Sequence, residues 1–278
     1  MKRIAIPVKT RYWKPGDDYI SIIKSSIIDK VEDGDTIVLS EKAISVAKGR
    51  LIDESKIKPS LLAKFIASFW MRYAWGYILA RLCRLKTKNV HRLRNYPVKE
   101  GASHKQLALI YTGFLQTLRN WSEGGIDVSN IPLTYACLPL DDPYGEAIKI
   151  QAEIQNIAKK LRVMIVDTDM TYSWRNLHIT PRPKPIKGIL SIGGFMTYVI
   201  GRALKLKHRA TPLAISSNIN LNEALDIAQL AHRARGSGAG RTAWDMAKRF
   251  GTSLTSVTWE MLDEVDHYPI VIVRSLNQ

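Results

Sequence analysis

The feature that most constrains the fold is an apolar–amphipathic–apolar pattern in residues 133–166. LTYACLPL (133–140) is typical of a strand, and RVMIV (162–166) is typical of another. Between them, Asp142 before Pro143 predicts a helix start, because aspartate accepts hydrogen bonds from free amides and proline fits the first turn. This helix is predicted to bury one apolar face: Ala147, Ile150, Ile154, Ile157 and Leu161.

Other passages repeat the alternation of strand and helix. Strands are predicted in IAIPV (4–8), TIVLS (36–40), GILSIGG (188–194) and YPIVIVRSLNQ (268–278). Helices are predicted in YISIIKSSIIDKV (19–31) and FMTYVIGRALKL (195–206). EKAISVAKG (41–49) is predicted to be a short helix or loop that Gly49 can end. No internal repeat and no long low-complexity linker interrupts them. We therefore expect an α+β fold of mixed α/β type, as one compact domain over residues 1–278, in which residues 205–265 could form a smaller lobe.

The charge balance favours anionic partners. Lysine and arginine number 41 against 25 acids, which gives a net charge of +16. Arg84 to Lys105 is strongly basic. The run from Arg84 to Arg94 lacks the patterns of known nucleic-acid modules, so a solvated basic face is the preferred interpretation of this run and nucleic acid an unlikely partner. The two cysteines, Cys83 and Cys137, are interpreted as core thiols in a reducing cytoplasm.

The segment Leu61 to Arg81 requires a test against a transmembrane helix. It is long enough to span a bilayer, but Lys64 and Arg72 lie within it, and a central arginine is costly in lipid. We interpret it as a mostly buried helix of the core or of a subunit interface, with peripheral membrane contact as an alternative. Since the N-terminal apolar run is too short for a signal peptide, we expect a cytoplasmic protein without a transmembrane segment.

Acidic and hydroxyl groups follow the predicted strand at 162–166. Asp167, Thr168 and Asp169 are expected at its end, where ligands of open α/β folds gather. Such oxygens suit Mg²⁺ or Mn²⁺, although acids at a strand end are also common caps or turn residues. Asp127 is a second candidate, because it follows two glycines that allow a close backbone approach to a ligand.

A glycine-rich stretch offers a candidate phosphate site. GSGAGR (236–241) could hold phosphate through backbone amides, with Gly236 and Gly238 supplying flexibility and Arg241 supplying charge, or it could be a flexible loop. No Walker A, HExxH or GxSxG pattern occurs, which disfavours a P-loop, a zinc site or a serine hydrolase.

Taken in order, several segments resemble the coenzyme F420-0:L-glutamate ligase family, the gamma-glutamyl ligases of the deazaflavin coenzyme. GGIDVSN is similar to the family's AGIDxSN, VMIVDTDMTYSWR to VIITDTFGRPWR, and LPLDDPYGEAIKIQAEI to LPEDPDxSAxxIRxxI. The opening IPVKTRYWKPGDD, the segment VEDGDTIVLSEKAISVAKGRLIDESKIKPS and the closing PIVIVRS also resemble family segments. The resemblance spans nearly the whole chain and implies the fold of that family.

The resemblance also implies a reaction and its site residues. GTP phosphorylates a carboxylate of the phosphorylated deazaflavin precursor, and the amine of L-glutamate attacks the acyl phosphate. Two divalent ions, Mg²⁺ or Mn²⁺, would be held by Asp127, Asp167 and Thr168. Asn130 and Lys42 would contact the nucleotide. The resemblance further implies an enzyme of archaeal type that forms a homodimer. It assigns no catalytic residue.

Some positions depart from the family pattern. Val46 and Lys48 replace a lysine and a glutamate, Asp169 follows the Asp-Thr pair in place of phenylalanine, and the family's late VMGQ motif is not recognisable. Two alternatives therefore accompany the ligase hypothesis. One is a divergent or inactive member that takes another carboxylate acceptor, and the other is a basic protein that binds nucleic acid or another polyanion.

Overall fold

The computed structural model describes residues 2–276, which divide into two compact units. The first unit is built from residues 2–51, 128–168 and 209–276, and the second from residues 52–127 and 169–208. Residues 209–265 thus belong to the first unit. The single-domain organisation over residues 1–278, with a smaller lobe within 205–265, stays a prediction.

A mixed β-sheet forms the centre of the first unit. The order is β1 (Lys2–Thr10), β9 (His267–Leu276), β2 (Thr36–Ser40) and β5 (Arg162–Trp174), and β8 (Lys207–Ile215) also pairs with β5. β9 runs antiparallel to β1 and β2, whereas β2 and β5 are parallel. A mixed sheet with surrounding helices confirms the predicted α/β content.

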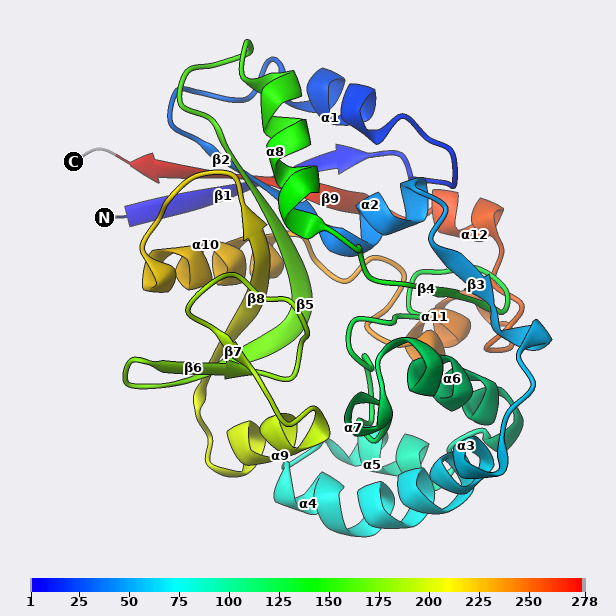
Figure 1. Ribbon diagram of the computed structural model, residues 1–278. Coiled ribbons are helices and arrows are strands. Elements are labelled where there is room, and N and C mark those ends of the chain that lie inside the picture. The colour runs from blue at the N-terminus through cyan, green and yellow to red at the C-terminus, as the bar shows by residue number, and fades with distance from the viewer. Residues whose placement is uncertain (1, 277–278) are drawn as a thin grey trace. The chain divides into compact units, whose positions relative to one another are not determined.

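Side-chain alternation divides the apolar residues of the sheet between two layers. Ile270 and Ile272 of β9 belong to the main hydrophobic cluster, which also includes Ile23 of α1 (Tyr19–Ile27) and Ile150 of α8 (Pro143–Ile154). Val271 lies between them on the strand and therefore faces the opposite side of the sheet. Helix α10 (Leu221–Ala234) packs against β1 and β9 (Figure 1). The helices of this unit are α1 (Tyr19–Ile27), α2 (Glu41–Ala47), α8 (Pro143–Ile154), α10 (Leu221–Ala234), α11 (Ala243–Phe250) and α12 (Trp259–Asp263).

The predicted start of α8 is confirmed. Asp142 is its N-cap, with Oδ1 accepting a hydrogen bond from the Gly145 amide over 2.9 Å, and Pro143 is the first helical residue. Ala147, Ile150 and Ile154 are fully buried, as the spacing predicts. The helix ends at Ile154, short of the expected Leu161.

Two strand predictions need correction. The strand expected at 133–140 is reduced to β4 (Tyr135–Cys137), which lies in a separate two-stranded sheet, and the amide of Leu138 donates to the carbonyl of Arg50. The strand expected at 162–166 continues as β5 to Trp174, so Asp167 to Asp169 lie inside a strand. Pairing with β2 nevertheless stops at Val166, so these acids follow directly upon the parallel part of β5.

The second unit is mostly helical. It contains η1 (Glu54–Lys56), α3 (Leu61–Phe65), η2 (Ile66–Leu79), α4 (Ala80–Leu82), α5 (Thr87–Arg94), α6 (Val98–Tyr111), α7 (Phe114–Thr117) and α9 (Phe195–Ala203), with β3 (Leu51–Asp53) at its start. The distal part of β5 pairs with β6 (Leu177–Thr180), and β6 pairs with β7 (Leu190–Ser191).

The helical segment beginning at Leu61 is only half buried, which corrects the expectation of a mostly buried helix. Met71 and Trp75 are fully buried, but Phe65, Phe69 and Tyr73 are at least half exposed. Its central part, η2, is a π-helix. No helix among residues 2–276 combines the length and hydrophobicity that crossing a membrane requires. Cys83 and Cys137 are free and buried, as expected for core thiols.

Candidate functional site

The glycine-rich loop of the first unit is held by Asn130. Oδ1 of Asn130 accepts a hydrogen bond from the amide of Ala239 over 2.6 Å, and Nδ2 donates to the carbonyl of Gly240 over 2.9 Å. A Cβ at Gly238 would lie 2.6 Å from Asn130 Oδ1, so only glycine leaves room for this contact. One side chain thus fixes the course of the loop through both a donor and an acceptor.

The backbone and surroundings of Asn130 support this role. Its φ of 55° is left-handed, a conformation that asparagine tolerates better than most residues. The hydroxyl of Tyr12 donates to its carbonyl over 2.8 Å. Tyr12 also packs in a small hydrophobic cluster with Ala239 of the loop. The loop is therefore anchored by an apolar residue as well as by hydrogen bonds.

Lys42 lies beside the same segment. It is the second residue of α2, and its Nζ donates to the carbonyl oxygen and the hydroxyl of Ser129 over 2.8 and 3.1 Å. Arg241 closes the loop, where its Nε donates to Ser237 Oγ over 3.2 Å. The structure thus brings together all five predicted nucleotide-binding residues in the first unit: Lys42, Asn130, Gly236, Gly238 and Arg241. Their binding of a nucleotide stays a prediction.

Asp167 and Thr168 form a compact pair of oxygen donors. Oδ1 of Asp167 accepts the Thr168 amide over 2.5 Å and lies 3.3 Å from the Thr168 hydroxyl oxygen. His232, near the end of α10, is a neighbour that sequence reasoning missed. Burial and the cations Arg235 and Arg241 lower the pKa of His232 to about 4, against the opposing effect of Asp167. His232 is therefore a neutral imidazole at pH 7.

Asp127 belongs to the second unit, as its last residue before the chain enters the first. Asp167 and Thr168 belong to the first unit, so a metal centre shared by the three residues stays a prediction. No group of three or more histidine, cysteine, aspartate or glutamate side chains in the described part of the chain is placed to hold a metal ion.

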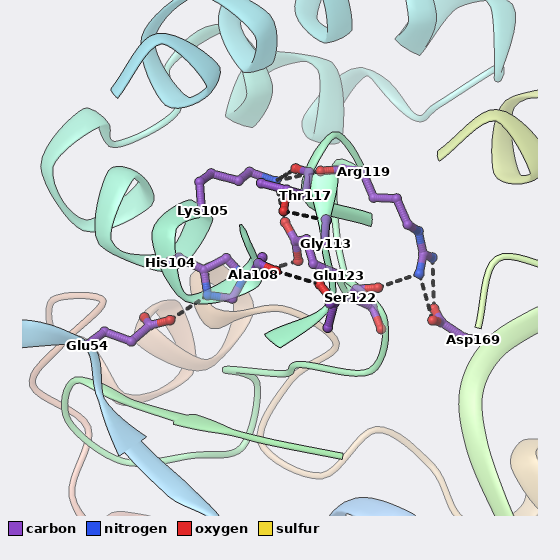
Figure 2. A network of polar contacts seen from close by, with 11 residues as sticks. Glu54, His104, Lys105, Ala108, Gly113, Thr117, Arg119, Ser122, Glu123 and Asp169 are labelled. Carbon is purple, nitrogen blue, oxygen red and sulfur yellow. Dashed lines mark hydrogen bonds and ion pairs between the residues drawn. The ribbon is translucent and has the colours of Figure 1, made fainter. Parts of the chain in front are cut away.

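A network of buried charges surrounds Glu123, which lies shortly before Asp127 in the sequence (Figure 2). Nζ of Lys105 is fully buried and donates to the carbonyls of Thr117 and Arg119, over 2.9 and 2.6 Å, and to Glu123 Oε1. The other carboxylate oxygen of Glu123 lies 3.0 Å from His104 Nε2. Three donated hydrogen bonds require an ammonium group, so Lys105 is charged.

His104 completes this network, which we call the Glu123 network: Glu54, His104, Lys105 and Glu123. His104 Nδ1 lies 2.6 Å from Glu54 Oε1, so both ring nitrogens face carboxylates. Burial by itself lowers the pKa of His104, but Glu54 and Glu123 outweigh burial and raise it to about 10. Burial opposes ionisation of Glu123 as well, yet Lys105 and His104 hold its pKa well below the usual value.

The Glu123 network fixes the start of the segment that carries Asp127. Glu123 forms an isolated antiparallel bridge with Ile126. Between them, Arg182 Nη1 donates to the carbonyl of Gly124 over 2.9 Å, and a Cβ at Gly125 would lie 2.6 Å from the Arg182 guanidinium carbon. The two glycines, predicted to admit a ligand, are thus required for the close approach of the protein's own side chains.

Asp169 has a structural partner. Its two carboxylate oxygens accept hydrogen bonds from Arg119 Nη1 and Nη2 over 2.7 and 2.8 Å, and both side chains are almost completely buried. Such a bidentate pair is a strong, geometrically specific contact. Of the two acids in Asp-Thr-Asp, Asp169 thus forms a structural ion pair within the second unit. Asp167 is the better candidate for ligand binding.

Sequence reasoning missed the buried cations of this region. Lys105 is the last residue of the strongly basic stretch Arg84 to Lys105, and it is fully buried, although no role was predicted for it. The usable signals were the adjacent pair His104 and Lys105 and the position of Glu123 before a glycine pair; neither is specific enough alone.

Comparisons with known proteins identify the family of the chain. Residues 7–219 match the family F420-0:Gamma-glutamyl ligase, and the chain belongs to that family. It is 36% identical over 284 residues to an uncharacterized protein, MJ1361, of Methanocaldococcus jannaschii, and the match covers 97% of this chain and 96% of the relative. It is also 31% identical over 157 residues to the coenzyme F420:L-glutamate ligase of Archaeoglobus fulgidus, covering 56% of this chain and 55% of that protein. The resemblance of the sequence motifs to this family is thereby confirmed.

Proposed function

We propose that this protein is a nucleotide-dependent ligase that joins L-glutamate to coenzyme F420-0 through an amide bond. In this reaction GTP transfers its terminal phosphoryl group to a carboxylate of the acceptor. The amine nitrogen of glutamate attacks the acyl carbon, an amide bond forms, and phosphate leaves with the bonding electrons. Membership of the gamma-glutamyl ligase family supports this proposal.

The observation that carries the proposal is the anchoring of the glycine-rich loop by Asn130. A loop held at Ala239 and Gly240 presents its backbone in a fixed geometry, which is what binding a phosphate chain requires. Arg241 follows the loop directly, and Lys42 lies beside Asn130. These cations would offset the negative charge of the triphosphate and of the acidic substrates.

The donor set of Asp167 and Thr168 fits a hard divalent cation. A carboxylate and a hydroxyl from adjacent residues, 3.3 Å apart, are oxygen ligands of the type that Mg²⁺ and Mn²⁺ prefer. We propose that these two residues and Asp127 would hold two such ions, which supply charge neutralisation to the phosphates when bound. The chain's own contribution is to hold the Asp127 segment and the glycine-rich loop in place before substrates arrive.

A second candidate is the same chemistry on a different carboxylate acceptor. Lys48, one of the departures from the family pattern, forms an ion pair of 2.6 Å with buried Glu146, and Glu146 also accepts the Tyr19 hydroxyl. Asp169, another departure, is engaged by Arg119. Both new residues thus have structural partners, and neither contributes to the hydrogen bonds described for the glycine-rich loop, so the proposed phosphate site is compatible with a changed acceptor.

The decisive experiment is a set of incubations followed by mass spectrometry. The protein is mixed with coenzyme F420-0, L-glutamate and Mn²⁺, with GTP in one reaction and ATP in another, and reactions without nucleotide or glutamate serve as controls. We expect glutamylated product only in the complete mixtures. Other carboxylate acceptors are tested in parallel, and product from one of these alone would support the second candidate. Absence of product with every nucleotide and acceptor would refute the ligase assignment.

Homodimer formation remains a separate prediction. Sedimentation velocity of the purified protein measures it directly, and a single monomeric species across the accessible concentration range would contradict it.

A further inference from the structure

Positive charge is concentrated in one segment of the second unit. Residues 55–99 contain eleven lysines and arginines and no aspartate or glutamate, so this segment carries +11 of the chain's net +16. The remaining 233 residues share a net charge of only +5. The proposed ligase reaction uses residues outside this segment, so its charge calls for another explanation.

The same segment exposes a row of aromatic rings along α3 and η2. Phe65, Phe69, Tyr73 and Tyr77 are 54, 50, 56 and 48% exposed. Successive ring centroids in this row are 5.2, 5.4 and 6.2 Å apart, so the rings form a continuous surface. Four exposed aliphatic residues extend this surface at the two ends: Leu61, Leu62, Ile78 and Leu82. We call these eight residues the aromatic face.

The opposite side of the helix is fixed to the protein. Met71 and Trp75 are fully buried, and Trp75 Nε1 donates to the carbonyl of Leu118 over 2.7 Å. Arg72 donates through two nitrogens to the carbonyl of Tyr96. The helix is therefore anchored along one side, and the aromatic face is its outward side.

Cations border the aromatic face. Lys64 and Arg81 are exposed on the same helical segment, and Arg84 and Lys86 are exposed directly after it. The Arg94 guanidinium lies 4.2 Å from the centroid of the Tyr77 ring. An anchored helix with an apolar face, bordered by lysines and arginines and free of acids, has the composition of helices that lie in a membrane interface.

We propose that the aromatic face docks onto a bilayer surface that contains anionic lipids. The phenylalanine and aliphatic side chains would enter the boundary of headgroups and acyl chains, the tyrosine hydroxyls would remain at headgroup level, and the bordering cations would contact lipid phosphates. This proposal concerns a surface of the second unit and is independent of the proposed ligase reaction.

Two other occupants fit the surface less well. A second copy of the chain would bring another segment of +11 to the same place, and like charges oppose such a contact. A nucleic acid would use the cations and could stack on the rings, but it has no use for four exposed leucine and isoleucine side chains. An anionic bilayer satisfies the aliphatic, aromatic and cationic groups together.

Vesicle co-sedimentation of the full chain tests the proposal. One set of vesicles is pure phosphatidylcholine, and in the other about a third of the lipid is phosphatidylglycerol. We expect binding to the anionic vesicles, weakened by high salt because surface charges are screened. Two triple variants, Phe65→Ser/Phe69→Ser/Tyr73→Ser and Arg81→Gln/Arg84→Gln/Lys86→Gln, should each lower the partition coefficient about tenfold or more.

Matched controls remove similar groups elsewhere. Ile28→Ser/Leu133→Ser/Tyr144→Ser changes three exposed apolar residues of the first unit, and Lys2→Gln/Lys159→Gln/Lys248→Gln removes three exposed charges there. Neither control should reduce binding. Each of three outcomes would overturn the proposal: no binding to anionic vesicles, equal loss in the controls, or an aromatic-face variant whose only change is a shift from dimer to monomer or a loss of RNA binding.

Discussion

The amide of Ala239 donates a hydrogen bond to Oδ1 of Asn130 over 2.6 Å. This contact links two parts of the chain more than one hundred residues apart and holds the glycine-rich loop in one conformation. If the loop binds the phosphates of a nucleotide, Asn130 is a positioning residue, whose loss should affect nucleotide affinity more than the fold.

Asn130→Gly should weaken nucleotide binding. Glycine adopts the left-handed φ of Asn130 without strain, so the substitution removes the loop contacts and little else. Lost hydrogen bonds of about 1–2 kcal/mol in total predict a rise of roughly 5- to 30-fold in the KM for nucleotide. Steady-state kinetics measures this effect. Asn156→Gly, at an exposed position beyond α8, is the control, and equal KM values in both variants would contradict a role for Asn130.

Two acids only two residues apart should give opposite phenotypes. Asp167→Asn should abolish turnover and leave the free energy of unfolding nearly unchanged, because Asp167 is half-buried and proposed to bind a cation. Asp169→Asn should instead lower the free energy of unfolding by about 3–5 kcal/mol, since it leaves the Arg119 guanidinium buried without its carboxylate. Urea unfolding and product formation are measured on both variants. Full activity of Asp167→Asn would remove that residue from the proposed site.

Glu123 should be the most sensitive residue of the buried network. Glu123→Gln leaves the Lys105 ammonium and the His104 imidazolium without their shared counter-ion, and a loss of about 3–5 kcal/mol in unfolding free energy is expected. The double variant Glu123→Gln/Lys105→Met should recover part of this loss, because the buried ammonium is gone. If the double variant is as unstable as the sum of the two single variants, the charges are not coupled.

The stability of the protein should depend on alkaline pH through His104. Its pKa is raised to about 10 in the folded protein, above the value of 6.5 expected for the unfolded chain. The folded state therefore holds this proton more tightly, and the resulting stabilisation is complete below pH 6.5 and disappears as the pH rises through about 10. Urea unfolding between pH 6 and 10 should show a decline that is smaller in His104→Gln. Identical slopes in both proteins would contradict a charged His104.

Local sequence signals predicted much of the first unit. The α8 cap at Asp142 and the period of Ala147, Ile150 and Ile154 depend on neighbouring residues, and both are confirmed. The length of β5 was not predictable in this way. Its continuation through Asp167 to Trp174 places polar residues inside a strand, and pairing with β6, a tertiary contact, supports its distal end.

The contacts that organise the candidate site could not be predicted from the sequence, and ligand binding by its residues stays a prediction. The family motif drew attention to Asn130. Nothing local indicates that its side-chain amide hydrogen-bonds to the backbone of Ala239 and Gly240, because both residues lie far along the chain. Lys105 is a second residue whose surroundings no local signal indicates. A lysine is rarely buried, and only Glu123, distant in sequence, and two carbonyl oxygens make the burial of this one tolerable.

The uneven distribution of charge affects how the purified protein behaves on charged matrices. Heparin or a cation exchanger will engage residues 55–99 first, and salt elution will report mainly on that segment. An acidic contaminant retained there could be mistaken for a specific ligand of the glycine-rich loop. Titrations of nucleotide are therefore best performed at moderate ionic strength, or with the Arg81→Gln/Arg84→Gln/Lys86→Gln protein, in which this competing surface is weakened.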